Sequence, residues 1–473
     1  MSLEEQLAAS QAELAAKDAQ IAAQAVRIVA LEKLVGELRE LLSRNSGNSH
    51  RPPSSDPPGS RTAKSKAKEK RKRGGQKGHR GAFRILVAPE RVDAVLDFYP
   101  PSCGHCGAPL PEIRDPDARR YQLLDLDPFK PHVKEFRRHE VECPGCGGRT
   151  RAAYDAATIP ASPFGPRLMA IVVLLTGVYH LSRRKARRLL CDLYGLDISL
   201  GAISRVEARM SPALVPAVEE AQSEVESADV KHADATTWLR AGVTMSLWVV
   251  ATAMATVYRV LKDGCTETIL PLFGELPRGI LVSDRASVFG FWAMKLRQIC
   301  WAHLWRKFCG FSERDGPAGA FGRALLECTL LLFDYWHAFK DGRLTRQELA
   351  AWMRPLRRQV EDVLERAVAA NIPRLSGSCA NILAHRDALW TFIDAEGVEP
   401  TNNEAERELR AFVLWRKMSF GTQSVRGEQF AERIMTVVHT GRKQGVDILA
   451  FLVRTWTAYV HKTPPPALLA RAT

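Results

Sequence analysis

The 473-residue sequence contains no apolar run long enough to cross a membrane. Its longest apolar stretches, Leu168–Val178 and Met245–Val257, fall well short of the roughly 18 residues that a spanning helix requires. The N-terminal segment mixes Glu, Gln, Lys and Ala, without the basic and apolar regions of a signal peptide. We therefore expect a cytoplasmic protein whose 10 cysteines are reduced and serve as metal ligands or core residues rather than disulfides.

Acidic residues are fewer than basic ones, with 53 Asp and Glu against 67 Lys and Arg and a formal net charge of +14. Most of the excess lies in Arg51–Arg84, where many Lys and Arg residues are opposed only by Asp56 and Glu69. Proline and glycine interrupt this run, which predicts an arm that is disordered when free and that binds nucleic-acid phosphates. A solubilising linker is the alternative. The candidate contacts are Lys70, Arg71, Lys72, Arg73 and Lys77.

A heptad pattern precedes the basic run. Apolar residues recur every seven positions, and a second seam joins them late in the segment. This pattern predicts a coiled coil that joins protomers into a homo-oligomer, although Gly36 weakens the helix. The alternative is a lone amphipathic helix that packs on its own protein. The seam residues are Leu7, Leu14, Ile21, Ile28, Val35 and Leu42, with Leu31 and Leu38.

Two Cys-x-x-Cys knuckles follow the basic run, Cys103 with Cys106 and Cys143 with Cys146. Four thiolates from two such knuckles form the closed tetrahedral shell of a structural zinc site. The spacer between them alternates polar and apolar residues, which predicts a hairpin between the knuckles. The other six cysteines show no comparable pairing, and we expect them in the core: Cys191, Cys265, Cys300, Cys309, Cys328 and Cys379.

From Pro163 to Met210 the apolar residues recur with the spacing of an α-helix. A helix over Arg183–Tyr194, closed by Gly195, precedes another that starts near Ser199. This order is typical of a helix-turn-helix that enters the major groove of DNA, and an ordinary three-helix packing domain is the alternative. In the first of the two helices, Leu189, Leu190 and Leu193 are expected to face inward. The basic candidates for DNA contact are Arg183, Arg184, Lys185 and Arg187.

Short β-branched runs follow, and they predict a mixed sheet with helices on its faces. The residues Glu313–Glu396 are expected to be almost entirely helical. A further helix is predicted over Thr401–Gly421, with Asn402 or Asn403 as its N-cap. The predicted strands are Val230–Thr236, Ser246–Ala253, Val257–Leu261, Gly279–Ser283 and Gln298–Trp301.

Three acidic positions stand out on these elements. Asp234 ends the first predicted strand and Asp284 ends the fourth, so the carboxyl edge of the sheet would hold them together. Glu406 lies in the first turn of the helix after Thr401, and Glu404 competes with it because spacing does not distinguish them. Converging carboxylates suit divalent ions such as Mg²⁺ or Mn²⁺ in phosphodiester chemistry. Arg407 and Arg410 share the helix and would meet phosphates, or else pair with the neighbouring glutamates.

Together these segments resemble the IS66 family of DDE transposases, which bacterial insertion sequences encode. The resemblance is carried by several motifs in one order along the chain, together with the zipper and the double knuckle. They are the Asn48–Pro58 stretch, Gly74-Gly-Gln-Lys-Gly-His79, His232-Ala-Asp234-Ala-Thr, Cys300-Trp-Ala-His303, Thr401-Asn-Asn-Glu-Ala-Glu406-Arg and Arg416-Lys-Met-Ser-Phe-Gly421.

The resemblance implies an RNase H-like catalytic domain with a helical insertion, and it assigns Asp234, Asp284 and Glu406 as metal-binding catalytic acids. Ala235 departs from the glutamate that many relatives carry after the first aspartate. Cys300 and His303 are interpreted as core or DNA-facing residues and not as a zinc site. The expected fold is multidomain α+β, with a coiled coil (1–46), a basic arm (47–88), a zinc module (89–158), a helix-turn-helix (159–212), a split catalytic domain (225–312 and 397–473) and a helical insertion (313–396).

The implied function is that of a DNA transposase, which binds the terminal inverted repeats of its element and cleaves and transfers strands with Mg²⁺ or Mn²⁺, while Zn²⁺ is structural. Its partners would be double-stranded DNA, further copies of the chain and accessory proteins, and no membrane. A catalytically inactive, transposase-derived DNA-binding regulator is the main alternative. A metal-dependent nuclease without strand transfer is a third reading.

Overall fold

The computed structural model describes residues 3–45, 47–48, 86–126, 131–153 and 162–469. It separates into two compact units, residues 63–134 in one and residues 1–62 with 135–473 in the other. The basic arm Arg51–Arg84, with its candidate contacts Lys70, Arg71, Lys72, Arg73 and Lys77, lies outside the described residues. Within the described ranges, no helix has the length and apolar character needed to cross a membrane.

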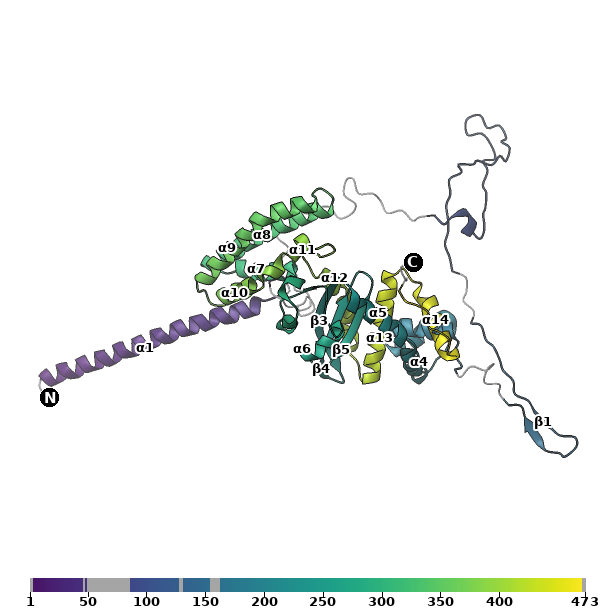
Figure 1. Cartoon of the computed structure of the whole chain (residues 1–473), viewed down its shortest axis with the longest axis horizontal. Coiled ribbons are helices and arrows are strands. Elements are labelled where there is room, and N and C mark those ends of the chain that lie inside the picture. The colour runs from purple at the N-terminus through teal and green to yellow at the C-terminus, as the bar shows by residue number, and fades with distance from the viewer. Residues whose placement is uncertain (1–2, 46, 49–85, 127–130, 154–161, 470–473) are drawn as a thin grey trace. The chain divides into compact units, whose positions relative to one another are not determined.

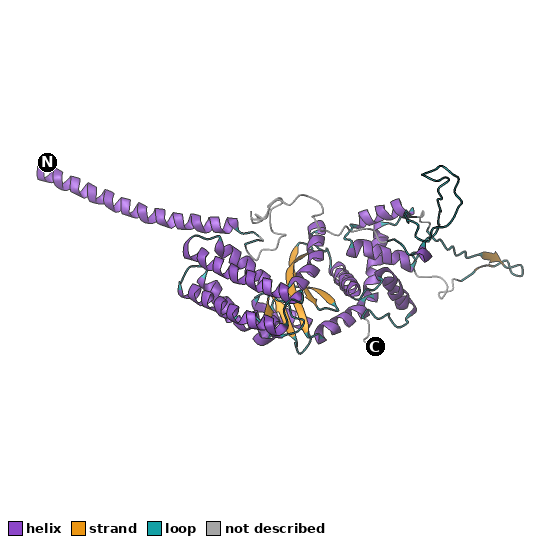
Figure 2. Ribbon diagram, turned by 90° about the horizontal axis from the view of Figure 1, so that it is seen from above, coloured by secondary structure: helices purple, strands orange, loops and turns teal. Residues whose placement is uncertain are grey.

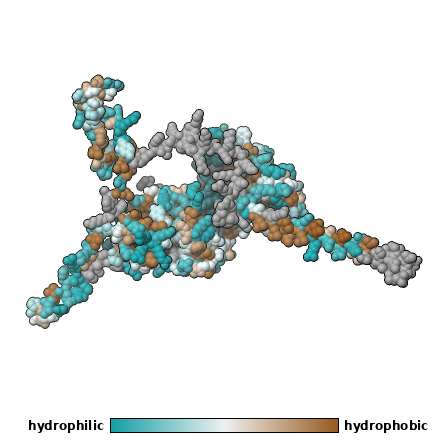
Figure 3. All heavy atoms as spheres, turned by 180° about the vertical axis from the view of Figure 1, so that it is seen from behind, coloured by the Kyte–Doolittle hydropathy of each residue, from teal (hydrophilic) through white to brown (hydrophobic). Residues whose placement is uncertain are grey.

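The heptad segment forms a single helix, α1 (Leu3–Ser43). Its described seam side chains are largely exposed in the single chain, for example 63% at Ile21 and 55% at Ile28. Apolar side chains therefore lie at the surface of α1 (Figure 3). Such an apolar stripe is buried only when another helix packs against it. The predicted coiled coil would provide that second helix.

The second knuckle lies in a hairpin. Strands β1 (Glu140–Glu142) and β2 (Arg149–Arg151) pair antiparallel on either side of Cys143 and Cys146. The prediction of a hairpin between the knuckles is wrong, since β1 is the only strand among the described spacer residues. Two of the cysteines expected in the core, Cys191 and Cys265, are exposed.

The predicted helical segment forms a short bundle of three helices and a single turn of π-helix. Ser182 caps α3 by accepting a hydrogen bond from the Lys185 amide, and Gly195 ends it in the left-handed conformation. In α3 the buried residues are Ala186 and Leu190, whereas Leu193 is 58% exposed and does not face inward as expected. The elements are α2 (Pro166–Val173), the π-turn η3 (Leu174–Val178), α3 (Arg183–Tyr194), α4 (Leu200–Ala213) and, after it, α5 (Val215–Ser227).

All five predicted strands of the mixed sheet are present, in the order β5-β4-β3-β6-β7. The first three form an antiparallel meander, and β6 and β7 continue the sheet in parallel with β3. Figure 2 shows the sheet in orange with helices around it. The strands are β3 (Val230–Arg240), β4 (Val243–Ala251), β5 (Thr256–Leu261), β6 (Ile280–Ser283) and β7 (Arg297–Ile299).

Both faces of the sheet are covered, as alternate residues of β4 show. Leu247 and Val249 join a core with α2–α4 and the C-terminal helices, while Trp248 and Val250 join a second core with α5. The helical segment α2–α4 and the sheet therefore share one continuous core. Connecting these strands are α6 (Thr266–Ile269) and the 3-10 turns η4 (Leu270–Phe273), η5 (Ser287–Phe291) and η6 (Met294–Leu296).

The segment after β7 is helical, as predicted; its helices up to α11 share a core with Val282 of β6 and Ile299 of β7, whereas α12–α14 join the core of α2–α4. Figure 1 shows α8 and α9 of this insertion side by side, with α12 next to β3. The helices are α7 (Trp301–Ser312), α8 (Gly316–Lys340), α9 (Arg346–Ala369), α10 (Ser376–Ala384), η7 (Arg386–Leu389), α11 (Thr391–Asp394), α12 (Asn403–Ser419), α13 (Val425–Lys443) and α14 (Ile448–His461).

Candidate active site

Asp234 and Asp284 come from neighbouring parallel strands. The ladder between β3 and β6 pairs His232 with Val282, and each aspartate lies two residues further along its chain. Since residues two apart on a strand point to the same side, both carboxylates arise at the same level of the sheet. The strand pairing thus brings together the two acids that the sequence placed at strand ends.

Asp234 does not end its strand, which is a correction to the sequence prediction. β3 continues to Arg240 and pairs with β4 along that length. Only the parallel pairing to β6 stops early, because β6 ends at Ser283 and the chain turns away at Asp284. One edge of β3 is therefore left without a strand partner from Asp234 onward.

Helix α12 runs along this edge in the same direction as β3. Its start is bonded to β3 by Asn402, whose side-chain amide donates to the Ala233 carbonyl (2.8 Å). Near its end, the Arg416 guanidinium donates to Thr236 Oγ1 (3.1 Å), and Thr422 pairs with the backbone of Leu239. A 17-residue helix rises about 25 Å and seven strand residues span about 23 Å, so the two elements match in length.

Glu406, and not Glu404, is among the charges that raise the pKa of Asp234. Two residues on a helix are about 200° apart, so the neighbouring glutamates point to opposite sides of α12. Glu404 Oε1 lies 2.7 Å from the Lys443 ammonium of α13, and its Oε2 accepts from Arg407 (2.8 Å). Glu406 instead contacts α7 through Arg306, with 3.2 Å between Nη2 and Oε2. The structure thus separates the two candidates that spacing left equivalent.

The pKa of Asp234 shows that the three carboxylates share one electrostatic environment. Burial, with smaller contributions from the negative charges of Asp284 and Glu406, raises the pKa of this carboxyl to about 7. The Ala235 amide and the charge of Arg306 act in the opposite direction. Crowded, half-buried carboxylates of this kind are stabilised by a divalent cation with oxygen ligands, which the chemistry of the donor set fits.

Asn402 is a buried residue of the site whose role the sequence did not reveal. It occupies the expected N-cap position of α12, but its side chain makes no capping bond. Its Oδ1 lies 3.2 Å from His232 Nδ1, and its backbone amide donates to the Cys300 sulfur (3.1 Å). Asn402 therefore connects the start of α12 to β3 and to the end of β7. An N-cap signal alone gives no indication of such a connection.

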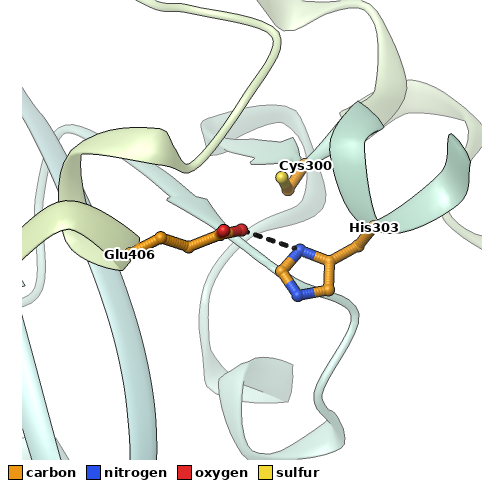
Figure 4. A group of neighbouring side chains, drawn as sticks. All are labelled: Cys300, His303 and Glu406. Carbon is orange, nitrogen blue, oxygen red and sulfur yellow. Dashed lines mark ion pairs between the residues drawn. The ribbon is translucent and has the colours of Figure 1, made fainter. Parts of the chain in front are cut away.

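Cys300 and His303 also lie beside Glu406, and Cys300 is buried in the core, which agrees with the interpretation of it as a core residue. Their ligand atoms and a Glu406 carboxylate oxygen all lie within 4.8 Å of one another. Figure 4 shows the sulfur, the imidazole ring and the carboxylate turned toward a common space. Burial raises the pKa of the Cys300 thiol to about 12. The Cys-x-x-His spacing was the only signal of this group in the sequence. It could not indicate Glu406, which lies about 100 residues further along the chain.

The basic residues of α3 divide into two kinds. Arg183 forms an ion pair with the buried Glu207 of α4 (2.5 Å between Nη2 and Oε2), and Arg187 pairs with Asp197 through two hydrogen bonds. These pairs hold α3 against α4 and the turn between them. Arg184 and Lys185 are exposed and, among the residues described, enter no ion pair. They remain the candidates for DNA contact.

On α12, Arg407 adopts the alternative pairing weighed from the sequence, because its guanidinium bonds Glu404. Its side chain is nevertheless 69% exposed, and Arg410 is exposed beside it. Both remain predicted phosphate contacts.

Each cysteine knuckle has the backbone of a metal-binding turn. The Gly107 and Gly147 amides donate to the carbonyls of Cys103 and Cys143, and both glycines have positive φ values of 74° and 72°. Hydrogen bonds from the backbone amides that follow lower the pKa of the Cys103 and Cys143 thiols. Cys106 and Cys146 are exposed. Such turns present thiolates without further rearrangement, whereas the shared four-thiolate zinc site stays a prediction.

Comparison with known proteins decides the family. Residues 161–430, more than half of the chain, match the model of the transposase IS66 family. The chain belongs to the IS66 transposase family. The match begins before α2 and ends within α13, so it includes all three carboxylates.

The remaining matches carry no functional description. Residues 3–84 match a family of unknown function, DUF6444. An uncharacterized protein, y4hP of Sinorhizobium fredii (strain NBRC 101917 / NGR234), is 23% identical over 407 residues, which cover 77% of this chain and 71% of that protein. The details of IS66 transposase chemistry in this chain therefore rest on the site itself.

Proposed function

We propose that this IS66 family member is a DNA transposase whose catalytic acids are Asp234, Asp284 and Glu406. The observation that supports it best is electrostatic: the charges of Asp284, after β6, and of Glu406, in the first turn of α12, both raise the pKa of Asp234 in β3. Helix-turn-helix, basic arm and zinc module would hold the terminal inverted repeats, with Arg184, Lys185 and Arg410 among the phosphate contacts.

The three carboxylates would hold Mg²⁺ or Mn²⁺, which when bound polarises the scissile phosphate and lowers the pKa of the attacking water. The chain itself supplies the positions of the oxygens. Parallel pairing of β3 with β6 would hold Asp234 near Asp284, and the contact of Asn402 with β3 would fix the start of α12, which carries Glu406. The Arg306 guanidinium holds one Glu406 oxygen at 3.2 Å, and this contact keeps the carboxylate turned toward α7 and the site. The RNase H-like assignment and the zinc held by Cys103, Cys106, Cys143 and Cys146 belong to the same proposal.

The test is cleavage of a duplex that carries the element's terminal repeat, with Mg²⁺, with Mn²⁺ and with EDTA. Asp234→Asn, Asp284→Asn and Glu406→Gln should each reduce cleavage by about a thousandfold or more while end binding stays within about twofold. Glu404→Gln is the matched control, because it removes a carboxylate from the same helix on the side that faces Lys443.

Two outcomes would contradict the proposal. Cleavage retained by Asp234→Asn would exclude the carboxylate assignment. Specific end binding by the unaltered chain without cleavage in either metal would instead identify the catalytically inactive regulator. Joining of pre-cut ends into a plasmid separates a transposase from a nuclease that lacks strand transfer.

A further inference from the structure

Three potential metal ligands of mixed type lie on one side of the proposed carboxylate site. Cys300 directly precedes α7, His303 lies in the first turn of α7, and Glu406 lies in the first turn of α12. One ligand atom from each lies within 4.8 Å of the other two, and this is the only such group among the described residues. In Figure 4 all three side chains converge from two helices that meet at this point.

The backbone around this group is fixed from both sides. The Cys300 amide donates to the Ser283 carbonyl (2.9 Å), which continues the pairing of β6 with β7. The Trp301 amide donates to the Pro400 carbonyl (2.8 Å), and the Glu406 amide donates to the Asn402 carbonyl (3.1 Å). Cys300 and Glu406 are thus held on rigid elements rather than on mobile loops, as a pre-organised metal site requires.

The two oxygens of Glu406 have different surroundings. Oε2 contacts Arg306, whereas Oε1 lies 3.5 Å from His303 Nδ1, is buried, and accepts no hydrogen bond from the described part of the chain. A buried carboxylate oxygen without a donor is unfavourable unless a cation or a hydrogen bond satisfies it. The Glu406 oxygen without a donor, Oε1, is the one that lies toward Cys300 and His303.

A thiolate, an imidazole and a carboxylate are together a ligand set for zinc and not for magnesium, which prefers oxygen alone. Tetrahedral zinc separates such donors by about 3.5 Å, so these side chains need to close by only about 1 Å. Three protein ligands also leave a fourth position open for water or an anion. We propose that Cys300, His303 and Glu406 form a second, thiophilic metal site, and that zinc bound there withholds Glu406 from magnesium.

Zinc would then inhibit metal binding at the carboxylate site, because one carboxylate oxygen cannot coordinate both metals equally well. By thermodynamic linkage, each metal weakens the binding of the other. The consequence for catalysis rests on the proposed function, but the binding of metal by Cys300 does not. The tests below therefore measure metal binding and not strand cleavage.

The first test uses Co²⁺ added to the full-length chain that already carries its knuckle zinc. The charge-transfer absorption of a sulfur–cobalt bond should appear in the unaltered chain and be absent from Cys300→Ser. His303→Asn and Glu406→Gln should weaken Co²⁺ binding about tenfold or more. Cys328→Ser, which alters another buried cysteine in α8, is the control and should keep the band. Identical spectra for Cys300→Ser and the unaltered chain would overturn the site.

The second test measures the coupling. Bound Mn²⁺ is followed by electron paramagnetic resonance while zinc is added to the full-length chain. Zinc should displace Mn²⁺ from the unaltered chain, and Cys300→Ser should require about tenfold more zinc or more for the same displacement. Equal displacement of Mn²⁺ in the unaltered chain and in Cys300→Ser would contradict the proposed competition between the two metals. Loss of the proposed function would appear elsewhere, as absence of cleavage in the terminal-repeat assay with both metal-binding results unchanged.

Discussion

Asp234 is the residue of the site whose ionisation is strongly disfavoured in the folded state. Its pKa of about 7 lies well above the ordinary aspartate value of 3.8, because burial and two neighbouring carboxylates disfavour its ionised form. The folded state thus holds this proton more tightly than the unfolded state. Stability gained in this way is fully present below about pH 4 and is lost as the pH rises through about 7.

This sign gives a prediction for the metal-free protein. In EDTA, the unaltered chain should lose thermal stability between pH 5 and pH 8, whereas Asp234→Asn, which cannot ionise, should show a flatter profile and a higher melting temperature at pH 8. Melting temperatures by scanning calorimetry across this range measure the effect. Asp263→Asn, at a partly exposed aspartate whose pKa is lowered by hydrogen bonds and therefore lies below this range, is the control and should follow the unaltered chain. Parallel profiles for Asp234→Asn and the unaltered chain would contradict the prediction.

At the scale of elements, α3 shows that basic residues on one helix serve two purposes. The Arg183 guanidinium clamps α3 to α4 through a glutamate that is itself buried, so its charge is committed within the fold. Arg184 and Lys185 follow directly in sequence, but their exposed side chains are available to phosphates. A count of basic residues cannot distinguish these roles.

The division predicts opposite phenotypes for neighbouring substitutions. The double variant Arg184→Ala, Lys185→Ala should weaken terminal-repeat binding and lower the salt slope by about two, with the melting temperature unchanged. Arg183→Ala should instead destabilise the fold by about 1–3 kcal/mol, because Glu207 loses its partner while buried. Filter binding at several salt concentrations and urea unfolding measure the two effects. A double variant with an unchanged salt slope would contradict the assignment.

The C-terminal half of α12 illustrates how one element is fixed by another. Gly421 follows it with φ of +95°, and a Cβ there would lie 2.1 Å from the Leu239 carbonyl oxygen. Only glycine permits this close approach, which lets Thr422 pair with the end of β3. Because the pairing anchors α12 along the open edge of β3, it also supports the position of Glu406 at the other end of the helix.

At the scale of the whole molecule, the exposed seam of α1 predicts self-association. Ile28→Glu together with Val35→Glu should disrupt the oligomer, since both residues occupy the first seam position and are exposed in the single chain. Sedimentation equilibrium would show a smaller assembly. Ala23→Glu, on the same helix and off both seams, should leave the assembly unchanged. An unaltered mass for the double seam variant would contradict the coiled-coil prediction.

Much of the architecture was accessible from sequence because its signals are local. Alternation and β-branching located the five strands, helical periodicity located the insertion and α12, and the positions of Asp234 and Asp284 after apolar runs indicated one edge of a sheet. The charge distribution likewise indicated the basic arm, which lies outside the described residues. Membership of the IS66 transposase family agrees with the order of motifs along the chain.

Local patterns along the chain specify which segments form helices and strands, and which residue types can carry chemistry. Which of these residues meet depends on packing between distant elements. Because Glu404 and Glu406 lie about 200° apart on α12, Glu404 contacts Lys443, whereas Glu406 lies near Cys300 and His303, from which the chain separates it by about 100 residues. Local propensity acts over a few residues, whereas convergence depends on packing between distant elements, here the docking of α12 on the open edge of β3.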